Sequence, residues 1–351
     1  MYETGEEERV NDAKGGKTAV VTGGNAGLGY ECVKAVAASD PKWRVVLAVR
    51  DPEKGGRAAR AIAEETGNPN VEAMGLDLAS LASIRSLAGD LAGRDDLPPL
   101  RAVVCNAGLQ VVGGTRYTQD GFEETFGVNH LGHFLLVNLL LRELEAPARV
   151  VVVSSGTHDP ERRTGMPAPR YRGAAALAHP ERHPDPDEEG EGAGKVGRRR
   201  YTASKLCNAM FTYELDRRLR AEGLSSLEAP IDANVFDPGA VPGTGLARDW
   251  GPLTRLAWDR GMARLVPVLR SLGVPFSTPE ASGRALARLV DDPFLRGVSG
   301  RYFEIDQEAR SSEESYERGK AAELWEASAA LVGLASGETP LAVGAAAPGA
   351  S

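Results

Sequence analysis

The chain has 351 residues, a hydrophobic content of 42% and a formal net charge of −8 at pH 7. This length suits one large domain or two smaller ones, with ample apolar side chains for a core. The negative charge argues against a general nucleic-acid binder, and no apolar run is long enough to cross a membrane. The N-terminus lacks an apolar signal core, and its acidic run at residues 6–8 argues against a transit peptide.

The thiol and imidazole side chains predict a reducing compartment and no metal site. The five histidines and three cysteines follow no metal-ligand spacing. Cys32, Cys105 and Cys207 lie far apart, which fits the cytoplasm, where thiols stay reduced. His130 and His133 are three residues apart on a predicted helix that begins near residue 126, and packing is the expected role for both.

The first predicted unit is a strand, a glycine-rich turn and a helix. Residues 18–21 form a short apolar run typical of a buried strand, and residues 30–38 carry apolar side chains at helical spacing. Glycines between them allow a tight turn and the close approach of a pyrophosphate, whose charge a helix N-terminus favours. The G-x-x-x-G-x-G spacing therefore predicts dinucleotide binding; the alternative is a turn without a ligand. The candidate residues are Gly23, Asn25, Ala26, Gly27, Leu28 and Gly29.

The second predicted strand, residues 44–49, ends where a dinucleotide fold reads the adenosine ribose. An acidic residue there bonds the 2′-hydroxyl of NAD, whereas an arginine suits the 2′-phosphate of NADP. The strand ends without an acid and Arg50 follows it, so we expect NADP(H) as the cofactor. The alternative is that Arg50 is a surface charge paired with Asp51 or Glu53.

Tyr201 and Lys205 are spaced to share one face of a helix. A lysine ammonium one turn away favours the phenolate, and so lowers the tyrosine pKa from its ordinary value of about 10. The tyrosine could then pass a proton to a substrate. Taken alone, the same spacing also fits a solvated surface pair.

These pieces, in their order, resemble the classical short-chain dehydrogenase/reductase family over roughly residues 17–306. The matching motifs are Thr22 to Gly29, Leu76-Asp77-Leu78, Asn106-Ala107-Gly108, Asn129, Ser154-Ser155, Tyr201 with Lys205, and Pro238-Gly239. Within the family, the chain resembles the branch of retinol dehydrogenases and light-dependent protochlorophyllide reductases. The phrases shared with that branch lie at residues 48–51, 120–123, 128–134, 204–208 and 324–328.

The resemblance implies an α/β fold, with one Rossmann-type doubly wound domain in which helices flank a parallel sheet. The alternation of predicted strands with amphipathic helices agrees with it. We expect this domain to cover residues 17–335. It would lie between a flexible tail at residues 1–16 and a disordered tail at residues 336–351.

The resemblance also implies a catalytic set of four residues. Tyr201 would act as the general acid or base, and Lys205 would lower its pKa and hydrogen-bond the nicotinamide ribose. Ser155 would hold the substrate oxygen, and Asn129 would hold a water molecule that links Lys205 to solvent. The alternative roles are a turn serine for Ser155 and a helix-interior polar residue for Asn129.

Further cofactor contacts follow from the same resemblance. Asp77 would end a third strand and bond the adenine amine, and Leu78 would pack on the adenine ring. Thr244 holds the threonine position of the family's Pro-Gly-x-x-x-Thr pattern and would bond the nicotinamide carboxamide. The residues that would end strands beside the cofactor are Asn106, Ala107, Gly108, Pro238 and Gly239.

Two segments distinguish this chain. An insertion at about residues 158–200 is polar and proline-rich, so we expect an ordered beginning and a mobile middle, with residues 184–196 dispensable for folding. A helical substrate lid is expected at about residues 245–276, with Trp250 and Trp258 on its apolar face. Its arginines would suit an anionic group, and peripheral contact with an anionic membrane is the minority alternative.

The sequence therefore predicts an NADP(H)-dependent oxidoreductase that interconverts a hydrophobic carbonyl compound and its alcohol. One alternative is a light-dependent protochlorophyllide reductase, although the residues after Ser155 do not resemble that enzyme. The other is a non-enzymatic NADP-binding regulator, but such proteins usually lose the tyrosine or the lysine, and this chain keeps both. The sequence does not distinguish a monomer from an oligomer.

Overall fold

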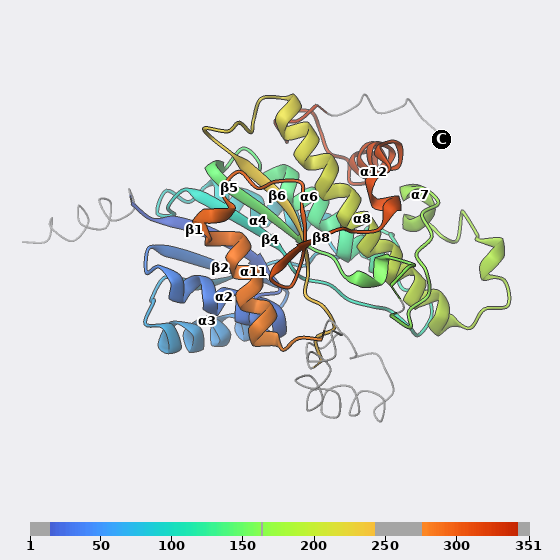
Figure 1. Ribbon diagram of the computed structural model, residues 1–351, viewed down its shortest axis with the longest axis horizontal. Helices are drawn as coiled ribbons and strands as arrows, with labels where there is room; N and C mark the ends of the chain where they lie inside the picture. The colour runs from blue at the N-terminus through green and yellow to red at the C-terminus, as the bar shows by residue number, and fades with distance from the viewer. Residues whose placement is uncertain (1–14, 163, 243–275, 343–351) are drawn as a thin grey trace, which may run out of the picture.

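A computed structural model describes residues 15–162, 164–242 and 276–342 of the chain. Its centre is an eight-stranded sheet in the order β3-β2-β1-β4-β5-β6-β7-β8 (Figure 1). Every neighbouring pair is parallel except β7 and β8, which are antiparallel. The strands are β1 (Lys17–Thr22), β2 (Trp43–Val49), β3 (Val71–Gly75), β4 (Leu100–Cys105), β5 (Leu144–Val153), β6 (Ile231–Asp237), β7 (Tyr302–Glu304) and β8 (Gln307–Ala309).

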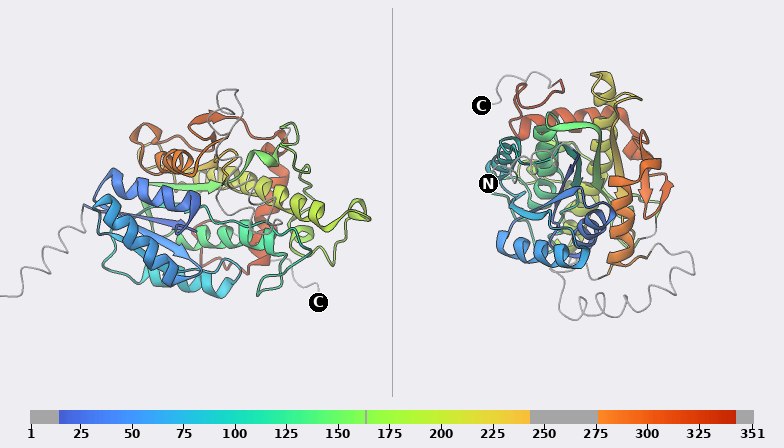
Figure 2. Two further views of the ribbon diagram at one scale, coloured as in Figure 1. Left: turned by 90° about the horizontal axis from the view of Figure 1, so that it is seen from below. Right: turned by 90° about the vertical axis from the view of Figure 1, so that its left-hand side faces the viewer.

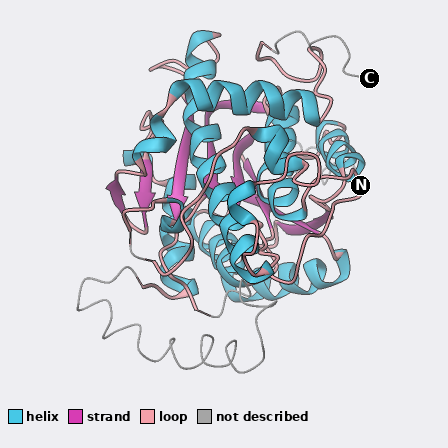
Figure 3. Ribbon diagram, turned by 90° about the vertical axis from the view of Figure 1, so that its right-hand side faces the viewer, coloured by secondary structure: helices cyan, strands magenta, loops and turns pink. Residues whose placement is uncertain are grey.

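Helices cover both faces of the sheet, as Figures 2 and 3 show. One apolar core lies under α2 (Gly27–Ser39), α3 (Pro52–Thr66) and α11 (Pro279–Asp291). The other lies under α4 (Leu81–Ala92), α6 (Gly132–Leu140), α8 (Ala193–Ala221) and α12 (Arg318–Leu331). Successive strand residues point to opposite faces, so Val20 joins one core while Ala19 and Val21 join the other. The expected doubly wound fold is thus confirmed.

Shorter elements complete the described chain. Asn129 lies in a single π-helical turn, η1, between a short helix and α6. The short elements are α5 (Glu124–Phe126), η1 (Gly127–Leu131), η2 (Gly156–His158), α7 (Ala174–Ala178), η3 (Pro186–Glu188), η6 (Pro293–Leu295) and η7 (Glu313–Tyr316). Within the described ranges, no helix combines the length and the apolar character needed to cross a membrane.

Three details differ from the sequence expectations. The third strand ends at Gly75, so Asp77 lies in the loop after it. The C-terminal tail does not begin at residue 336, because Thr339 and Leu341 are buried and the Thr339 hydroxyl donates to Asn138 Oδ1 at 3.1 Å. The expected mobile middle of the insertion contains η3 and the first turn of α8, which starts at Ala193.

At Gly283 of α11, the backbone packs so closely on α2 that there is no space for a side chain. A Cβ atom there would lie 2.3 Å from Glu31 Cβ and 2.8 Å from its backbone carbon. Gly283→Ala should therefore force the helices apart and lower the free energy of unfolding by roughly 1–3 kcal/mol. Gly89→Ala in α4 is the control: a Cβ there meets no atom within 4 Å, so it should stabilise by about 0.5–1 kcal/mol. Denaturant unfolding of both variants tests this; equal effects would contradict the close crossing.

Candidate active site

The candidate residues gather at the carboxyl edge of the parallel sheet. Thr22 ends β1, Cys105 ends β4, Val153 ends β5 and Asp237 ends β6. The order of strands reverses between β1 and β4, and in open α/β sheets ligands bind at such a switch point. The glycine-rich turn after β1 and the Tyr201 helix therefore lie at the same edge of the sheet.

The glycine-rich turn is built too tightly for side chains. Gly23 and Gly27 have φ angles of 66° and 54°, which favour glycine. A Cβ on Gly29 would lie 2.5 Å from both Asn106 Nδ2 and the Gly23 carbonyl oxygen. The Asn106 amide fixes the turn by donating to the Thr22 carbonyl at 2.8 Å. Gly29 and Asn106 thus hold the chain where a phosphate could approach the backbone.

The N-terminus of α2 fits an anion. Its N-cap is Ala26, which offers no side-chain hydrogen bond, and its first turn contains no acidic residue. By contrast, Asp51 caps α3, with its carboxylate accepting from the Lys54 amide. The first N–H groups of α2 therefore have no side-chain cap, as a pyrophosphate site requires. Asn25, Ala26 and Leu28 lie in this stretch.

Arg50 lies exposed directly after β2, on the same edge of the sheet. The alternative partner, Asp51, is already engaged: it pairs with Lys54 Nζ at 2.8 Å. None of the ion pairs formed by the described residues includes Arg50 or Glu53. The guanidinium group is thus free to meet a ligand phosphate.

The remaining cofactor candidates within the described residues lie in the loops that follow β3, β4 and β6. Asp77 Oδ1 accepts the Ala79 amide at 3.0 Å, and Leu78 is buried beside Gly132. Gly239, with a φ angle of 70°, follows Pro238 and donates its amide to Asp237. Ala107 and Gly108 follow β4, and the Ala107 amide donates to Thr22 Oγ1 at 2.9 Å. Thr244 and the expected lid, with Trp250 and Trp258, lie outside the described residues.

Tyr201, Lys205 and Ser155 come together across α8 and the end of β5. Tyr201 and Lys205 are 5% and 4% exposed, so they are not a solvated surface pair. Lys205 Nζ lies 5.6 Å from the centre of the Tyr201 ring and donates to the Val153 carbonyl at 3.1 Å. Ser155 follows that strand and is half-buried, and its hydroxyl is near enough to the Tyr201 phenol to lower the pKa of that phenol. A buried phenol and a buried ammonium group thus lie beside a serine hydroxyl.

Burial decides the protonation of this site. It raises the pKa of Tyr201 above its ordinary value, with a further rise from the charge of Asp237 and an opposing effect from the Ser155 hydroxyl. Burial also lowers the pKa of Lys205 to about 8, against the opposing charge of Asp237. Desolvation is thus the largest influence on the pKa of the phenol in the protein alone, and the lowering expected from Lys205 stays a prediction. Tyr201 keeps its proton, as a general acid must.

The Asn129 side chain links the loop after β4 to α8 by hydrogen bonds. Its Oδ1 accepts the Leu109 amide at 2.8 Å, and its Nδ2 donates to the Leu109 carbonyl at 2.9 Å and to Ser204 Oγ at 3.0 Å. A Cβ on Gly108 would lie 3.3 Å from Asn129 Oδ1 and 3.5 Å from Lys205 Nζ. Gly108, Asn129 and Lys205 thus converge, and π-turns such as η1 are frequent at functional sites.

His133 is a site residue that the sequence pattern assigned only to packing. Its Nδ1 lies 3.1 Å from the Asn129 carbonyl oxygen, and its Nε2 lies 2.9 Å from Thr22 Oγ1. A carbonyl only accepts, so Nδ1 donates to it and Nε2 accepts the Thr22 hydroxyl. Burial lowers the His133 pKa to about 4, so the ring stays neutral. The ring therefore connects the glycine-rich turn to the η1 turn that contains Asn129. Among the described residues, no group of three or more histidine, cysteine, aspartate or glutamate side chains could hold a metal ion.

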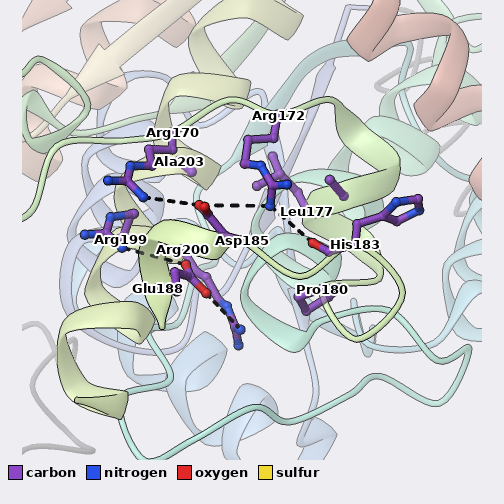
Figure 4. A pocket seen from close by; sticks show the side chains of 11 residues that line it. Arg170, Arg172, Leu177, Pro180, His183, Asp185, Glu188, Arg199, Arg200 and Ala203 are labelled. Atoms are coloured by element: carbon purple, nitrogen blue, oxygen red, sulfur yellow. Dashed lines mark hydrogen bonds and ion pairs between the residues drawn. The ribbon is translucent and has the colours of Figure 1, made fainter. Parts of the chain in front are cut away.

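The insertion folds against the N-terminal part of α8 and borders a small hollow with both charged and apolar side chains (Figure 4). Within the insertion, Arg170 lies 3.3 Å from Asp185. Arg199 of α8 binds Glu191, which precedes the helix, through two hydrogen bonds. The Arg199 pair therefore connects the insertion to the helix that carries Tyr201.

The family model for short chain dehydrogenases matches residues 17–166. The chain is 34% identical to chloroplastic protochlorophyllide reductase B of Hordeum vulgare over 342 residues, covering 90% of this chain and 79% of that protein. It is also 34% identical to polyprenol dehydrogenase of Homo sapiens over 325 residues, covering 91% and 86%.

Solved structures share the fold. A crystal structure of an uncharacterized protein from Mycobacterium Paratuberculosis has a TM-score of 0.56 and 30% identity, covering 90% of this chain and 93% of that chain. A blue fluorescent protein from a metagenomic library, solved in complex with NADPH, has a TM-score of 0.56 and 23% identity, covering 83% and 96%.

Proposed function

We propose, since the chain belongs to the short-chain dehydrogenase family, that it is an NADP(H)-dependent oxidoreductase interconverting a hydrophobic carbonyl compound and its alcohol. The observation that carries the proposal is the buried pair of Tyr201 and Lys205 beside Ser155 at the sheet edge. A phenol next to a serine hydroxyl is suited to exchange a proton with one substrate oxygen. A non-enzymatic regulator would have no need to keep this pair buried.

The residues of the chain fit the cofactor. The uncapped N-terminus of α2 and the backbone of the glycine-rich turn would hold the pyrophosphate, and Arg50 would bind the 2′-phosphate. Pro238, Gly239 and Thr244 would border the nicotinamide. When bound, NADPH supplies the hydride that reduces the carbonyl carbon. The free, buried cysteines support the proposed cytoplasmic setting.

The chain's own groups perform the proton chemistry. Tyr201 donates its proton to the carbonyl oxygen as negative charge develops there, and the Ser155 hydroxyl stabilises that charge by a hydrogen bond. Lys205 stays close enough to stabilise the tyrosinate left behind. In alcohol oxidation the same groups work in reverse, with Tyr201 as the base.

A panel of carbonyl compounds and alcohols tests this function. The purified chain is incubated with NADPH or NADP, and the NADPH absorbance is followed in the dark. We expect dark turnover of at least one apolar ketone, aldehyde or alcohol, and none with Tyr201→Phe. A parent chain that binds NADPH but turns over no member of the panel in the dark would count against the proposal.

The second candidate is light-dependent reduction of protochlorophyllide. The protochlorophyllide reductase of Hordeum vulgare aligns with 90% of this chain, which is the observation in its favour. Polyprenol dehydrogenase has the same identity, so identity alone does not choose between them. Visible spectra of the chain with protochlorophyllide and NADPH, before and after illumination, separate the candidates: only the second predicts a light-dependent change of the pigment.

Arg50→Ala should weaken NADPH binding much more than NADH binding. Only NADPH carries the 2′-phosphate, and a hydrogen bond to a charged group contributes about 1.5–3 kcal/mol, which is roughly tenfold or more in affinity. Fluorescence titration with both cofactors measures the difference. Arg60→Ala, an exposed arginine on α3, is the control and should leave both affinities unchanged. Equal losses for NADPH and NADH would show that Arg50 does not read the phosphate.

A further inference from the structure

Asp237 is a buried carboxylate at the end of β6, directly before Pro238 and Gly239. It is 1% exposed. Its Oδ1 accepts the Gly239 amide at 2.9 Å, and its Oδ2 accepts the Tyr302 hydroxyl at 2.8 Å. A buried charge is costly unless a counter-charge and hydrogen bonds compensate it. The counter-charge in this case comes from the insertion.

Arg162 supplies that charge from the turn after η2. Its Nη1 lies 3.5 Å from Asp237 Oδ2 and 2.5 Å from Glu304 Oε1. Asp237 and Glu304 are register partners on the parallel strands β6 and β7, so their carboxylates would repel one another without a cation between them. The Arg162 guanidinium also lies 5.9 Å from the centre of the Tyr302 ring. Arg162 therefore joins the insertion to the end of the sheet.

The ion pair lies directly behind the catalytic serine. Gly156 follows Ser155, and a Cβ on Gly156 would lie 3.0 Å from both Arg162 Nη1 and Asp237 Oδ2. His158 holds the same turn from its other side: its Nδ1 lies 2.5 Å from the Ser155 carbonyl oxygen, and its Nε2 accepts the Ser312 amide. The Ser155 turn thus rests on the Asp237–Arg162 pair with no space for a side chain between them.

The charges of this group also act on the proton-transfer residues. Asp237 raises the pKa of both Tyr201 and Lys205, in each case as the second influence after burial. The other titratable or charged groups around Asp237 are His158, Asp159 and Arg162 from the η2 turn, and Tyr302 and Glu304 from β7. Burial lowers the pKa of His158, so Arg162 is the cation that faces the carboxylates.

We propose that Asp237 and Arg162 are positioning residues of the reaction: the ion pair between the buried carboxylate and the half-buried guanidinium supports the Ser155 turn and places its charges beside Tyr201 and Lys205. The proposal rests on the proposed function for its role in catalysis. The charge effect itself belongs to the folded chain and can be measured without a substrate. Removing one member of the pair should shift the titration of Lys205 in one direction, and removing the other should shift it in the opposite direction.

The test is an NMR titration of the Lys205 side chain in the full protein. Its ε-carbon signal is assigned with Lys205→Arg. In Asp237→Asn the ammonium loses a nearby negative charge, so the Lys205 pKa should fall by about one unit. In Arg162→Gln the carboxylates lose their cation, so it should rise by about as much. Arg162→Lys keeps the charge and is the matched control, with a titration close to that of the parent.

Opposite shifts support the proposal, because loss of packing alone has no reason to move the pKa in two directions. Shifts of the same sign, or a parent-like titration in both charge-removing variants, would overturn it. If Asp237→Asn does not fold, Arg162→Gln decides, because an upward shift that Arg162→Lys does not show is required. With a substrate from the carbonyl panel, the pH profile of kcat should move with the Lys205 pKa. A panel without turnover would refute the proposed function but leave the NMR result valid.

Discussion

Tyr201→Phe should abolish turnover and leave NADPH affinity close to that of the parent. The substitution removes the phenolic proton but keeps the ring, which is buried and faces the Lys205 ammonium. Loss of a general acid costs about 10²–10⁴-fold in rate. Steady-state kinetics with the best substrate of the panel, beside fluorescence titration with NADPH, measures both quantities.

Tyr213→Phe is the matched control for that variant. Tyr213 is also buried on α8, but its hydroxyl hydrogen-bonds Ser311 at 2.6 Å, away from the catalytic set. It should lower stability through the lost hydrogen bond and leave kcat unchanged. A near-normal kcat in Tyr201→Phe, or an equal loss in both variants, would remove Tyr201 from its role as the acid.

The fold and the glycine-rich turn were predictable because their signals are local. The run at residues 18–21, the glycines after it and the apolar spacing of residues 30–38 correspond to β1, the tight turn and α2. The alternation of strands and helices predicts parallel strands, whereas their order in the sheet depends on contacts between distant residues. Family resemblance added Asn129 and Ser155, whose chemistry no local pattern reveals.

The rest of the site depends on contacts between distant residues. His133 and Thr22 are 111 positions apart, and Asp237 meets Arg162 only because β6 ends beside the η2 turn. One signal was present in the sequence, since an aspartate at the end of a strand needs a partner when it is buried. The Tyr201 pKa depends on the same kind of information: spacing gives the distance to Lys205 but not the burial, which is the largest influence on the phenol.

The insertion also shows that the composition of a segment does not reveal which contacts its side chains make. Residues 184–196 are charged and poor in apolar groups, which led to the expectation that they are dispensable. In the structure their carboxylates pair with arginines: Asp185 with Arg170, as Figure 4 shows, and Glu191 with the buried Arg199. Hydrogen bonds from Arg199 and Lys195 lower the Glu191 pKa to about 2. The polar side chains of this segment therefore form ion pairs, and the pair of Glu191 with Arg199 contacts the helix that carries Tyr201.

Replacing residues 184–196 by a glycine-serine linker should consequently destabilise the protein, in contrast to the expectation from composition. The change removes the first turn of α8 and the carboxylates that face four arginines: Arg170, Arg172, Arg199 and Arg200. A nearly buried guanidinium without its partner is strongly unfavourable, so the melting temperature should fall on the order of 10 °C. Thermal melts followed by circular dichroism measure the change, and NADPH titration shows whether the active site survives it.

Two single variants separate the ion pairs from the loss of helix. Glu191→Ala removes the partner of Arg199, whereas Glu189→Ala, two residues earlier, removes an exposed carboxylate for which the described residues contain no ion pair. Only the first should lower the melting temperature, and more so at low salt, where the lost attraction is least screened. If the linker variant has the melting temperature of the parent, and the two single variants have equal melting temperatures, the ion pairs contribute nothing to stability. The segment is then dispensable for folding.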